Sequence, residues 1–365
     1  MKSIATLLFL FFALNSNAQQ TNETILVGAV TRNYIQYLPT GFNSATESLP
    51  LIIVLHGLGG TNAQMALAGF NQISDTARFI SLYPQGLLNS FSQASWKNGL
   101  TGAESLADDI GLFNALIDEM ISTHNIDATK VYFTGFSMGS IMSYHMACNM
   151  NDRITAIGCM AGTMTNSDLV TCVPTYKTPV IHLHGTADAT VPYDGTPVTG
   201  LSLVQPTVDF WRNEHTCSSV ADSTRLPDTA ADGITVDRFV YQNCTPLNSV
   251  ELWRFNGAGH VYLYQPAYDI TESIEIWRFF RQWSKGTVGL AENKGVDFVI
   301  SPNPSNGHFT IQSEKKSDFN IYTATGKKVQ SGVLNLGNTP IDLSELEAGI
   351  YIVRIGNYSR KVLLH

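Results

Sequence analysis

The chain has 365 residues, of which 44% are hydrophobic and only 14% are charged, and its formal net charge at pH 7 is −8. This length allows two domains, and the apolar content is high enough to exclude a disordered chain. The negative charge and the lack of basic runs exclude nucleic acid and anionic membrane surfaces as expected partners. A neutral or polymeric substrate fits this charge better.

The first residues have the pattern of a secretory signal. Lys2 provides the positive charge, Ala5 to Leu14 form an apolar stretch, and Ser16-Asn17-Ala18 places small residues before a cleavage site. The apolar stretch is shorter than the roughly 20 residues that a membrane span requires. We therefore expect a signal peptide over residues 1–18, a mature chain from about Gln19, no membrane span and an oxidising destination.

Five cysteines follow the signal. An odd number in an exported chain predicts two disulfides and one free thiol, and the residues by themselves leave the pairing open. The five are Cys148, Cys159, Cys172, Cys217 and Cys244.

From about Thr24 to Trp283, strand-like runs alternate with helical periods, which is typical of a parallel sheet flanked by helices. The continuous apolar run Leu51–Leu55 predicts a strand that is buried on both faces. Val131–Phe133 and Val180–Leu183 predict two more central strands. We therefore predict an α/β domain with a mostly parallel central sheet over residues 19–285.

A helix is predicted over Ser105–Ile121, where apolar residues share one face and Ser105 with Asp108 fits a capping box. The residues of that face are Leu106, Ile110, Phe113, Ile117, Met120 and Ile121. Asp108 and Asp109 would lie in the first turn, where the helix dipole favours negative charge. We prefer this interpretation to a pair of catalytic carboxylates.

The strongest chemical signal is Gly135-Phe136-Ser137-Met138-Gly139, a G-x-S-x-G sequence between a predicted strand and a helix-compatible segment. Such a turn is too tight for side chains beside the serine, so glycines flank it. The turn lifts the hydroxyl clear of the sheet. Ser137 is therefore predicted to be a nucleophile, in preference to an idle serine in a glycine-rich turn.

A serine nucleophile of this kind needs two backbone N–H groups to stabilise an oxyanion. Met138 N–H follows the serine directly and would be the first donor. The loop His56-Gly57-Leu58-Gly59-Gly60 follows a buried strand, and Leu58 N–H would be the second donor. Trp96, an aromatic residue in a long polar loop, is a candidate for the wall of an acyl pocket.

Two aspartates compete for the acidic position of a triad in the order Ser, Asp, His. Asp188 lies just past the strand Val180–Leu183, where catalytic groups of parallel sheets collect. Asp194 precedes Gly195 and fits a turn residue. We therefore favour Asp188.

The base should follow the acid on a late loop. Of the nine histidines, His215, His260, His308 and His365 follow Asp188. His215 falls in a helix-like segment, and the last two belong to a different part of the chain. His260 ends the flexible sequence Asn-Gly-Ala-Gly-His after a predicted strand, so it is the predicted base.

No metal or cofactor is expected. The chain contains neither H-E-x-x-H nor C-x-x-C. His182 and His184 alternate along one strand, and we interpret them as core or strand-end residues.

The composition changes after Trp283. Residues 286–295 resemble a linker, and from Val296 to His365 short alternating strands are separated by turn residues such as Asn306-Gly307. This pattern predicts a small all-β domain, a β-sandwich, over residues 296–365.

Taken together, the sequences LHGLGG, YPQG at Tyr83–Gly86, GFSMGS, HGTADATVPY and GAGH resemble the secreted feruloyl esterase and polyhydroxybutyrate depolymerase family, over roughly Leu26–Trp283. The resemblance implies an α/β-hydrolase fold and hydrolysis of carboxylic esters that are attached to, or form, biological polymers. It carries the catalytic roles onto Ser137, Asp188 and His260. It also implies the disulfides Cys217–Cys244 and Cys148–Cys172, with Cys159 free.

The end of the chain resembles the C-terminal sorting domain of the type IX secretion system. The matching residues include Ser301-Pro302-Asn303-Pro304 and Ala348-Gly349-Ile350-Tyr351. The resemblance implies export through the periplasm to the outside or the cell surface, with the secretion machinery as a partner. A carbohydrate-binding β-sandwich is the alternative.

The sequence thus predicts a secreted serine esterase that acts on polymer-linked esters, first of all feruloyl or acetyl esters of plant cell-wall polysaccharide. A polyhydroxybutyrate or other polyester depolymerase is the second interpretation. A non-catalytic surface binding protein on the same fold is a third, of a different class, and a serine peptidase on this fold is a fourth.

Overall fold

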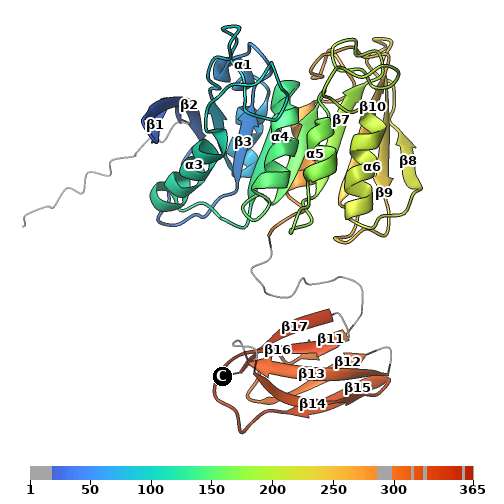
Figure 1. The fold of residues 1–365 in the computed structure, drawn as a ribbon. Coiled ribbons are helices and arrows are strands. Elements are labelled where there is room, and N and C mark those ends of the chain that lie inside the picture. The colour runs from blue at the N-terminus through green and yellow to red at the C-terminus, as the bar shows by residue number, and fades with distance from the viewer. Residues whose placement is uncertain (1–18, 286–297, 314–315, 324–326, 356–357, 365) are drawn as a thin grey trace, which may run out of the picture. The chain divides into compact units, whose positions relative to one another are not determined.

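The computed structural model describes residues 19–285, 298–313, 316–323, 327–355 and 358–364 (Figure 1). The predicted signal peptide, residues 1–18, and the predicted linker, residues 286–295, lie outside these ranges. The chain divides into two compact units, residues 1–285 and 286–365. Each unit is described by itself. None of the helices among the described residues is long and apolar enough to cross a membrane.

Ten strands of the first unit form one sheet in the order β1-β2-β4-β3-β5-β6-β7-β10-β9-β8. The six central strands from β4 to β10 pair in parallel, and the flanking pairs are antiparallel. The strands are β1 (Gln19–Val27), β2 (Val30–Leu38), β3 (Leu51–Leu55), β4 (Ile80–Pro84), β5 (Val131–Phe136), β6 (Ala156–Met160), β7 (Val180–Gly185), β8 (Ala221–Arg225), β9 (Thr235–Tyr241) and β10 (Val250–Asn256).

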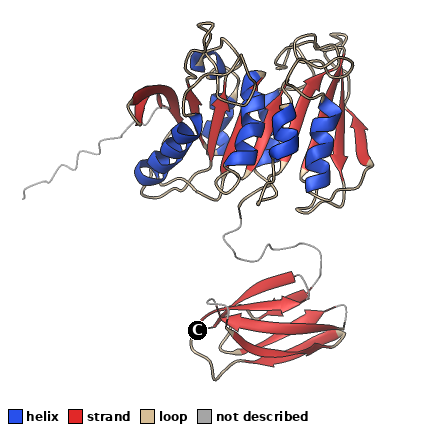
Figure 2. Ribbon diagram, viewed as in Figure 1, coloured by secondary structure: helices blue, strands red, loops and turns tan. Residues whose placement is uncertain are grey.

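Helices cover both faces of this sheet (Figure 2). They are α1 (Asn62–Met65), α2 (Phe70–Ala77), α3 (Asp109–His124), α4 (Met138–Asn149), α5 (Asn166–Thr171), α6 (Val204–Glu214) and α7 (Glu272–Phe280). Residues of α3, α4 and α6 form one core, and residues of α2 and α7 form the other. The predicted α/β fold with a mostly parallel central sheet is confirmed.

Strand β3 shows why its sequence is apolar throughout. All five of its residues are completely buried. Leu51, Ile53 and Leu55 belong to one core, and Ile52 and Val54 belong to the other. Because successive side chains of a strand point to opposite faces, a strand covered by helices on both faces requires a continuous apolar run.

The helix predicted over Ser105–Ile121 begins later than expected. α3 starts at Asp109, and its N-cap is Asp108, whose Oδ1 accepts the N–H of Gly111 at 2.8 Å. Leu106 precedes the helix and is 92% exposed, and Ile110 and Ile121 are also exposed. The buried stripe is Leu112, Phe113, Leu116, Ile117 and Met120. Because Asp108 caps the helix, α3 begins at Asp109, and its buried face differs from the predicted one.

Asp109 has a different role from its neighbour. Its Oδ1 lies 2.6 Å from Nη2 of Arg32 in an ion pair that is almost completely buried, and its Oδ2 accepts the N–H of Lys97 at 2.7 Å. Burial raises the pKa of Asp109, against the effects of the Lys97 N–H and of Arg32. Asp109 thus joins β2, α3 and the loop that follows Trp96, and it does not serve mainly as a first-turn charge.

Adjacent aspartates therefore allow a matched test of stability. Asp109→Ala should lower the free energy of unfolding by about 3–5 kcal/mol, because it leaves the Arg32 charge buried without a partner. Asp108→Ala removes only a cap at an exposed position and should cost about 1 kcal/mol. Urea unfolding of both variants, followed by tryptophan fluorescence, measures the difference. Equal losses would contradict this assignment of roles.

The disulfides form as the family resemblance implies. Cys148 at the end of α4 bonds to Cys172 just after α5, and Cys217 bonds to Cys244. Cys159 is free and buried in β6. Burial raises the pKa of the Cys159 thiol, so the thiol stays protonated.

The second unit is all-β, as predicted. One antiparallel sheet has the order β11-β12-β15 and the other has the order β14-β13-β16-β17. The strands are β11 (Phe298–Ser301), β12 (His308–Ser313), β13 (Ser317–Thr323), β14 (Lys328–Leu334), β15 (Gly337–Asp342), β16 (Gly349–Ile355) and β17 (Tyr358–Leu364). This unit has an apolar core of its own, which includes Phe309, Ile321 and Val353.

Candidate active site

Ser137 lies in the tight turn between β5 and α4. Its backbone has φ 56° and ψ −117°, a conformation that residues other than glycine rarely adopt. The Ser137 N–H donates to the carbonyl of Met160 on β6 at 2.8 Å, and the Ser137 carbonyl accepts the N–H of Ser140 at 2.9 Å. Hydrogen bonds to the neighbouring strand and the following helix therefore hold the strained residue at the centre of the sheet.

Glycines surround this turn because the backbone segments touch. A Cβ on Gly135 would lie 2.4 Å from the carbonyl carbon of Gly139. A Cβ on Gly139 would lie 2.2 Å from the carbonyl oxygen of Leu55, and one on Gly162 would lie 2.3 Å from the carbonyl oxygen of Ser137. No side chain fits at any of these positions. The expected requirement for glycine on both sides of the serine therefore has a direct steric cause.

The loop after β3 approaches Ser137 closely. A Cβ on Gly57 would lie 3.2 Å from the Cβ of Ser137. Leu58, the next residue, is 41% exposed. Within the described ranges, the N–H groups of Leu58 and Met138 donate to no protein acceptor. Both predicted oxyanion donors are thus unpaired, one on the loop beside the serine and the other directly after it.

His56 holds this loop in place, and sequence reasoning did not assign it a role. Its Nδ1–H donates to the carbonyl of Gly57 at 2.7 Å, and its Nε2 accepts the N–H of Gly86 at 2.9 Å. Burial lowers the pKa of His56, which keeps the ring neutral and able to act as donor and acceptor together. In the sequence, the position of His56 directly before the glycines of the loop was the feature that could have indicated this role.

Trp96 does not lie on the wall of an open pocket. Its side chain is completely buried, and its Nε1–H donates to the carbonyl of His56 at 2.8 Å. The ring packs at 4.7 Å from the His56 ring and 5.9 Å from Phe113. The buried N–H requires an acceptor, and the backbone carbonyl of His56 at the start of the loop supplies it. Trp96 therefore supports the loop of Leu58 from the core.

Asp188 and His260 meet although they are 72 residues apart in the sequence. Asp188 Oδ2 accepts from His260 Nδ1 at 2.7 Å, and Oδ1 accepts the N–H groups of Thr190 and Val191, each at 2.8 Å. Burial opposes ionisation, but hydrogen bonds from His184, His260 and Val191 outweigh it and hold the pKa of Asp188 well below its usual range. The competing Asp194 is exposed.

The two loops that carry this pair are joined by their backbones. β7 and β10 are parallel neighbours, so their carboxyl ends lie side by side. The N–H of Ala187 donates to the carbonyl of Ala258 at 2.9 Å, and the N–H of Gly257 donates to Oγ1 of Thr186 at 2.9 Å. A Cβ on Gly185 would lie 2.3 Å from the oxygen of Ala258. The glycines in both motifs allow this approach.

His260 also lies beside the nucleophile turn. Its ring is 4.8 Å from the ring of Phe136, the residue before Ser137, and its side chain is 17% exposed. Among the described residues, no hydrogen bond joins Ser137 to His260, so the Nε2 of His260 is available. In hydrolases without a bound substrate this contact is often long and tightens when the substrate binds.

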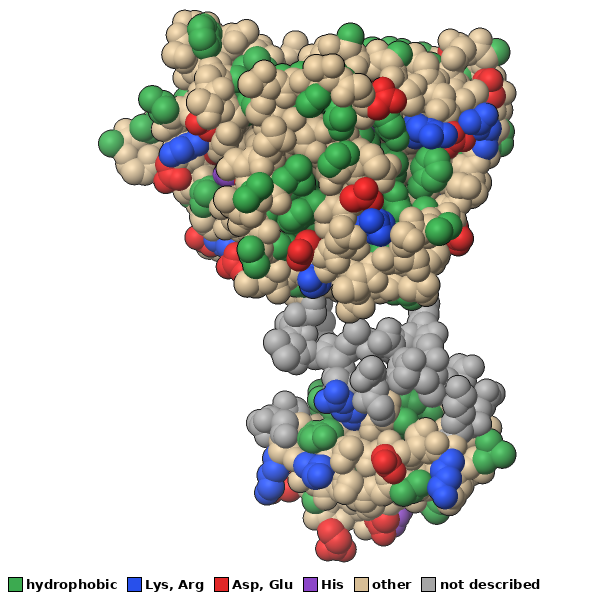
Figure 3. Space-filling view, turned by 45° about the vertical axis from the view of Figure 1, so that its right-hand side comes forward, with side chains coloured by type: hydrophobic (Ala, Val, Ile, Leu, Met, Phe, Trp, Pro, Cys, Tyr) green, Lys and Arg blue, Asp and Glu red, His purple; other side chains and the backbone are tan. Residues whose placement is uncertain are grey.

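Two hollows include residues next to the predicted site, one beside Phe136 and the other at Gly59. One, of about 550 Å³, is mostly apolar and includes the aromatic residues Phe136, Tyr262 and Tyr264. The other, of about 640 Å³, is more open and runs from Gly59 along the loop to Ala94. Charged side chains of both signs are dispersed over the face of the first unit in Figure 3. None of the residues that line the two hollows is charged.

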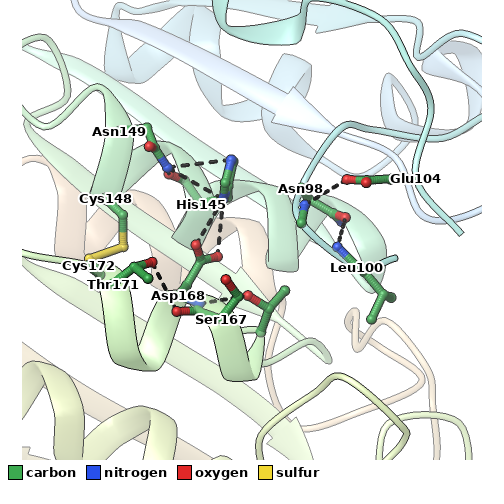
Figure 4. A network of polar contacts seen from close by, with 12 residues as sticks. Asn98, Leu100, Glu104, His145, Cys148, Asn149, Ser167, Asp168, Thr171 and Cys172 are labelled. Atoms are coloured by element: carbon green, nitrogen blue, oxygen red, sulfur yellow. Dashed lines mark hydrogen bonds and ion pairs between the residues drawn. A yellow bond between two sulfur atoms is a disulfide. The ribbon is translucent and has the colours of Figure 1, made fainter. Parts of the chain in front are cut away.

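A second histidine–aspartate pair lies between α4 and α5 (Figure 4). His145 Nδ1 lies 3.1 Å from each carboxylate oxygen of Asp168, and Asn149 donates to the His145 carbonyl at 2.8 Å. The disulfide Cys148–Cys172 joins the same two helices, so this network fastens α5 to α4. In the part of the chain that the structure describes, no group of three or more His, Cys, Asp or Glu residues could hold a metal ion.

The mostly parallel sheet with helices on both faces is the α/β-hydrolase fold. Residues 42–201 match the phospholipase/carboxylesterase family, and residues 299–363 match the secretion system C-terminal sorting domain. One region of the chain is thus similar to carboxylesterases, and another is similar to a secretion sorting domain. Together with the two disulfides, the sorting domain is consistent with a secreted or cell-surface protein.

Two similar proteins have names that include esterase activity. The bifunctional acetylxylan esterase/xylanase XynS20E of Neocallimastix patriciarum is 26% identical over 273 residues, which are 74% of this chain and 36% of the relative. Feruloyl esterase B of Piromyces equi is 27% identical over 245 residues, which are 63% of this chain and 42% of the relative. The chain thus spans less than half the length of these two relatives.

A solved structure shares the fold. The acetyl xylan esterase from Aspergillus awamori matches with a TM-score of 0.51 and 15% identity, over 73% of this chain and 99% of that chain. At this identity the likeness establishes the fold alone.

The segment after His260 is anchored by a buried carboxyl group. Glu272, at the start of α7, is 1% exposed; its Oε1 accepts the N–H of Leu263 at 2.7 Å, and its own N–H donates to the Leu263 carbonyl at 3.1 Å. Burial raises the pKa of Glu272 from 4.5 to about 8. The neighbouring Tyr262 hydroxyl donates to the carbonyl of Ala68 at 2.6 Å and accepts the N–H of Ser273 at 2.9 Å.

This raised pKa predicts a pH dependence of stability. Because protonation favours the folded state, the contribution of Glu272 is fully present below pH 4.5 and is lost as the pH rises through about 8. Glu272→Gln keeps the acceptor for Leu263 but cannot ionise. Its Tm should therefore exceed that of the wild type increasingly from pH 5 to about 8.5. Glu275→Gln, on the same helix, is the control, and a constant offset for Glu272→Gln would contradict the prediction.

Proposed function

We propose that this chain is a serine ester hydrolase in which Ser137 is the nucleophile, His260 the general base and Asp188 the acid that orients His260. The observation that carries the proposal is the 2.7 Å contact between Asp188 and His260, on loops that converge beside the strained Ser137. The unpaired N–H groups of Leu58 and Met138 support a role in binding an oxyanion. No cofactor is needed for this chemistry.

The proposed reaction has two halves. The Ser137 oxygen attacks the ester carbonyl carbon while His260 Nε2 takes the hydroxyl proton, and Asp188 stabilises the resulting imidazolium. The Leu58 and Met138 amides stabilise the oxyanion, and each donor is worth about 3 kcal/mol in comparable sites. The imidazolium then protonates the departing alcohol. Water, activated by His260, attacks the acyl-enzyme, releases the acid and restores the serine.

For the substrate we propose polymer-linked esters, first of all feruloyl or acetyl esters of plant cell-wall polysaccharide. The names of both relatives support this class. The apolar hollow beside Phe136 suits an aromatic acyl group, because the aromatic residues Phe136, Tyr262 and Tyr264 line it. The more open hollow, which includes Gly59 next to Leu58, leaves room for a polymer chain. The sorting domain supports the type IX secretion machinery as a further partner.

A substrate panel tests this proposal. Purified protein and Ser137→Ala are compared on methyl ferulate, acetylated xylan and poly(3-hydroxybutyrate), with released acid measured by chromatography. We expect hydrolysis of the first two substrates and a loss of at least about 10³-fold in the variant. Preference for the polyester would favour a depolymerase. Binding without hydrolysis of any of the three would indicate a non-catalytic surface protein, and cleavage of peptides alone would indicate a peptidase.

Variants of the two candidate aspartates test which of them is the acid of the triad and which is a turn residue. Asp188→Asn should lower kcat by about 10³–10⁴-fold, because the amide favours the wrong imidazole tautomer. Asp194→Asn, at an exposed position, should leave kcat within about twofold of the wild type. Steady-state hydrolysis of a soluble ester measures both. The reverse ranking would transfer the acidic role to Asp194.

A further inference from the structure

A chain of three buried side chains runs to Asp188 from the core. The Tyr144 hydroxyl lies 2.7 Å from His182 Nδ1, and His182 Nε2 lies 3.1 Å from His184 Nδ1. His184 Nε2 lies 2.8 Å from the carbonyl of Val191 and 3.4 Å from Asp188 Oδ2. Tyr144 and His182 are completely buried, and His184 is 1% exposed. The mechanism above uses none of the three.

The acceptor groups at the Asp188 end of this chain of side chains determine which ring nitrogens of His184 and His182 carry protons. The Val191 carbonyl and the Asp188 carboxylate only accept, so His184 Nε2 must carry a proton. In a neutral His184, Nδ1 then accepts from His182 Nε2–H. The remaining nitrogen of His182, Nδ1, accepts from the Tyr144 hydroxyl. Burial, with His184 beside it, lowers the pKa of His182 well below the usual value and keeps that ring neutral. Every hydrogen bond of the chain thus points toward Asp188.

His184 restrains Asp188 in two ways. Its Nε2 lies 3.4 Å from Oδ2, the oxygen that binds His260, and its Nε2–H donates to the carbonyl of Val191 at 2.8 Å. The N–H of the same Val191 donates to Oδ1 at 2.8 Å. The carboxylate can therefore rotate only if both contacts change. Tyr144 lies on α4, about two turns after Ser137, so the chain also joins the helix of the proposed nucleophile to the loop of the proposed acid.

We propose that His184 is a positioning residue for the active site, and that the chain Tyr144–His182–His184 orients the Asp188 carboxylate toward His260. This inference rests on the proposed function. It assigns a role to two histidines that the sequence indicated only as core or strand-end residues. Their place in a completely buried strand explains why hydrogen-bond partners, and not solvent, satisfy both rings.

Kinetics distinguish positioning from packing. His184→Leu should lower kcat by about 10- to 100-fold with KM within about twofold, because the carboxylate is no longer held in one orientation. His184→Gln, whose amide can reach the position of Nε2, should restore kcat to within about fivefold of the wild type. His215→Leu is the matched control, since His215 is equally buried but binds Ser249 Oγ at 2.7 Å, away from Asp188. It should lower Tm and leave kcat unchanged.

A folded His184→Leu with kcat within threefold of the wild type would overturn the proposal. If Ser137→Ala were inactive in the same assay, the proposed function would stand and this inference alone would fail. A wild type that hydrolyses no ester would count against the proposed function instead.

Proton positions provide a test that needs neither activity nor a variant. Two-bond nitrogen–proton correlation spectra of protein labelled with 15N-histidine report which ring nitrogen carries a proton. At pH 7 we expect His182 and His184 to be neutral and protonated at Nε2. A His184 without a proton on Nε2, or with protons on both nitrogens, would overturn the proposed chain of hydrogen bonds.

Discussion

The left-handed backbone of Ser137 is the constraint on which the site depends. A non-glycine residue at φ 56° is strained, and it persists here because three backbone segments enclose it. Gly139 lies against the carbonyl of Leu55, and Gly162 lies against the carbonyl of Ser137 itself. These contacts require β3, β5 and β6 to be neighbours, which is their order in the sheet. The position of the serine and the arrangement of the central strands therefore depend on the same backbone contacts.

The remaining site groups reach the same place because parallel strands end at the same edge. The loop after β3 carries Leu58, the loop after β7 carries Asp188 and the loop after β10 carries His260. Buried histidines then hold these loops through hydrogen bonds. His56 fixes the Leu58 loop, and His184 contacts both Asp188 and Val191. A neutral imidazole suits this work because one ring donates and accepts at opposite ends.

The two units each have an apolar core of their own. Apolar residues line the hollow beside Phe136, whereas charges on the face seen in Figure 3 are few and mixed in sign. A hollow lined by apolar and aromatic residues is suited to neutral, partly aromatic material. This physical character agrees with the proposed polymer-linked esters.

Local chemistry determined much of this protein from the sequence alone. The run Leu51–Leu55, the glycines around Ser137 and the turn-rich tail indicated the buried strand, the tight turn and the small β unit, because each depends on sterics or burial within a few residues. The tertiary structure decided the rest. It buried Trp96 beneath the loop, paired Asp109 with Arg32 and directed His182 and His184 toward Asp188. Those roles depend on groups distant in sequence, which no local pattern specifies.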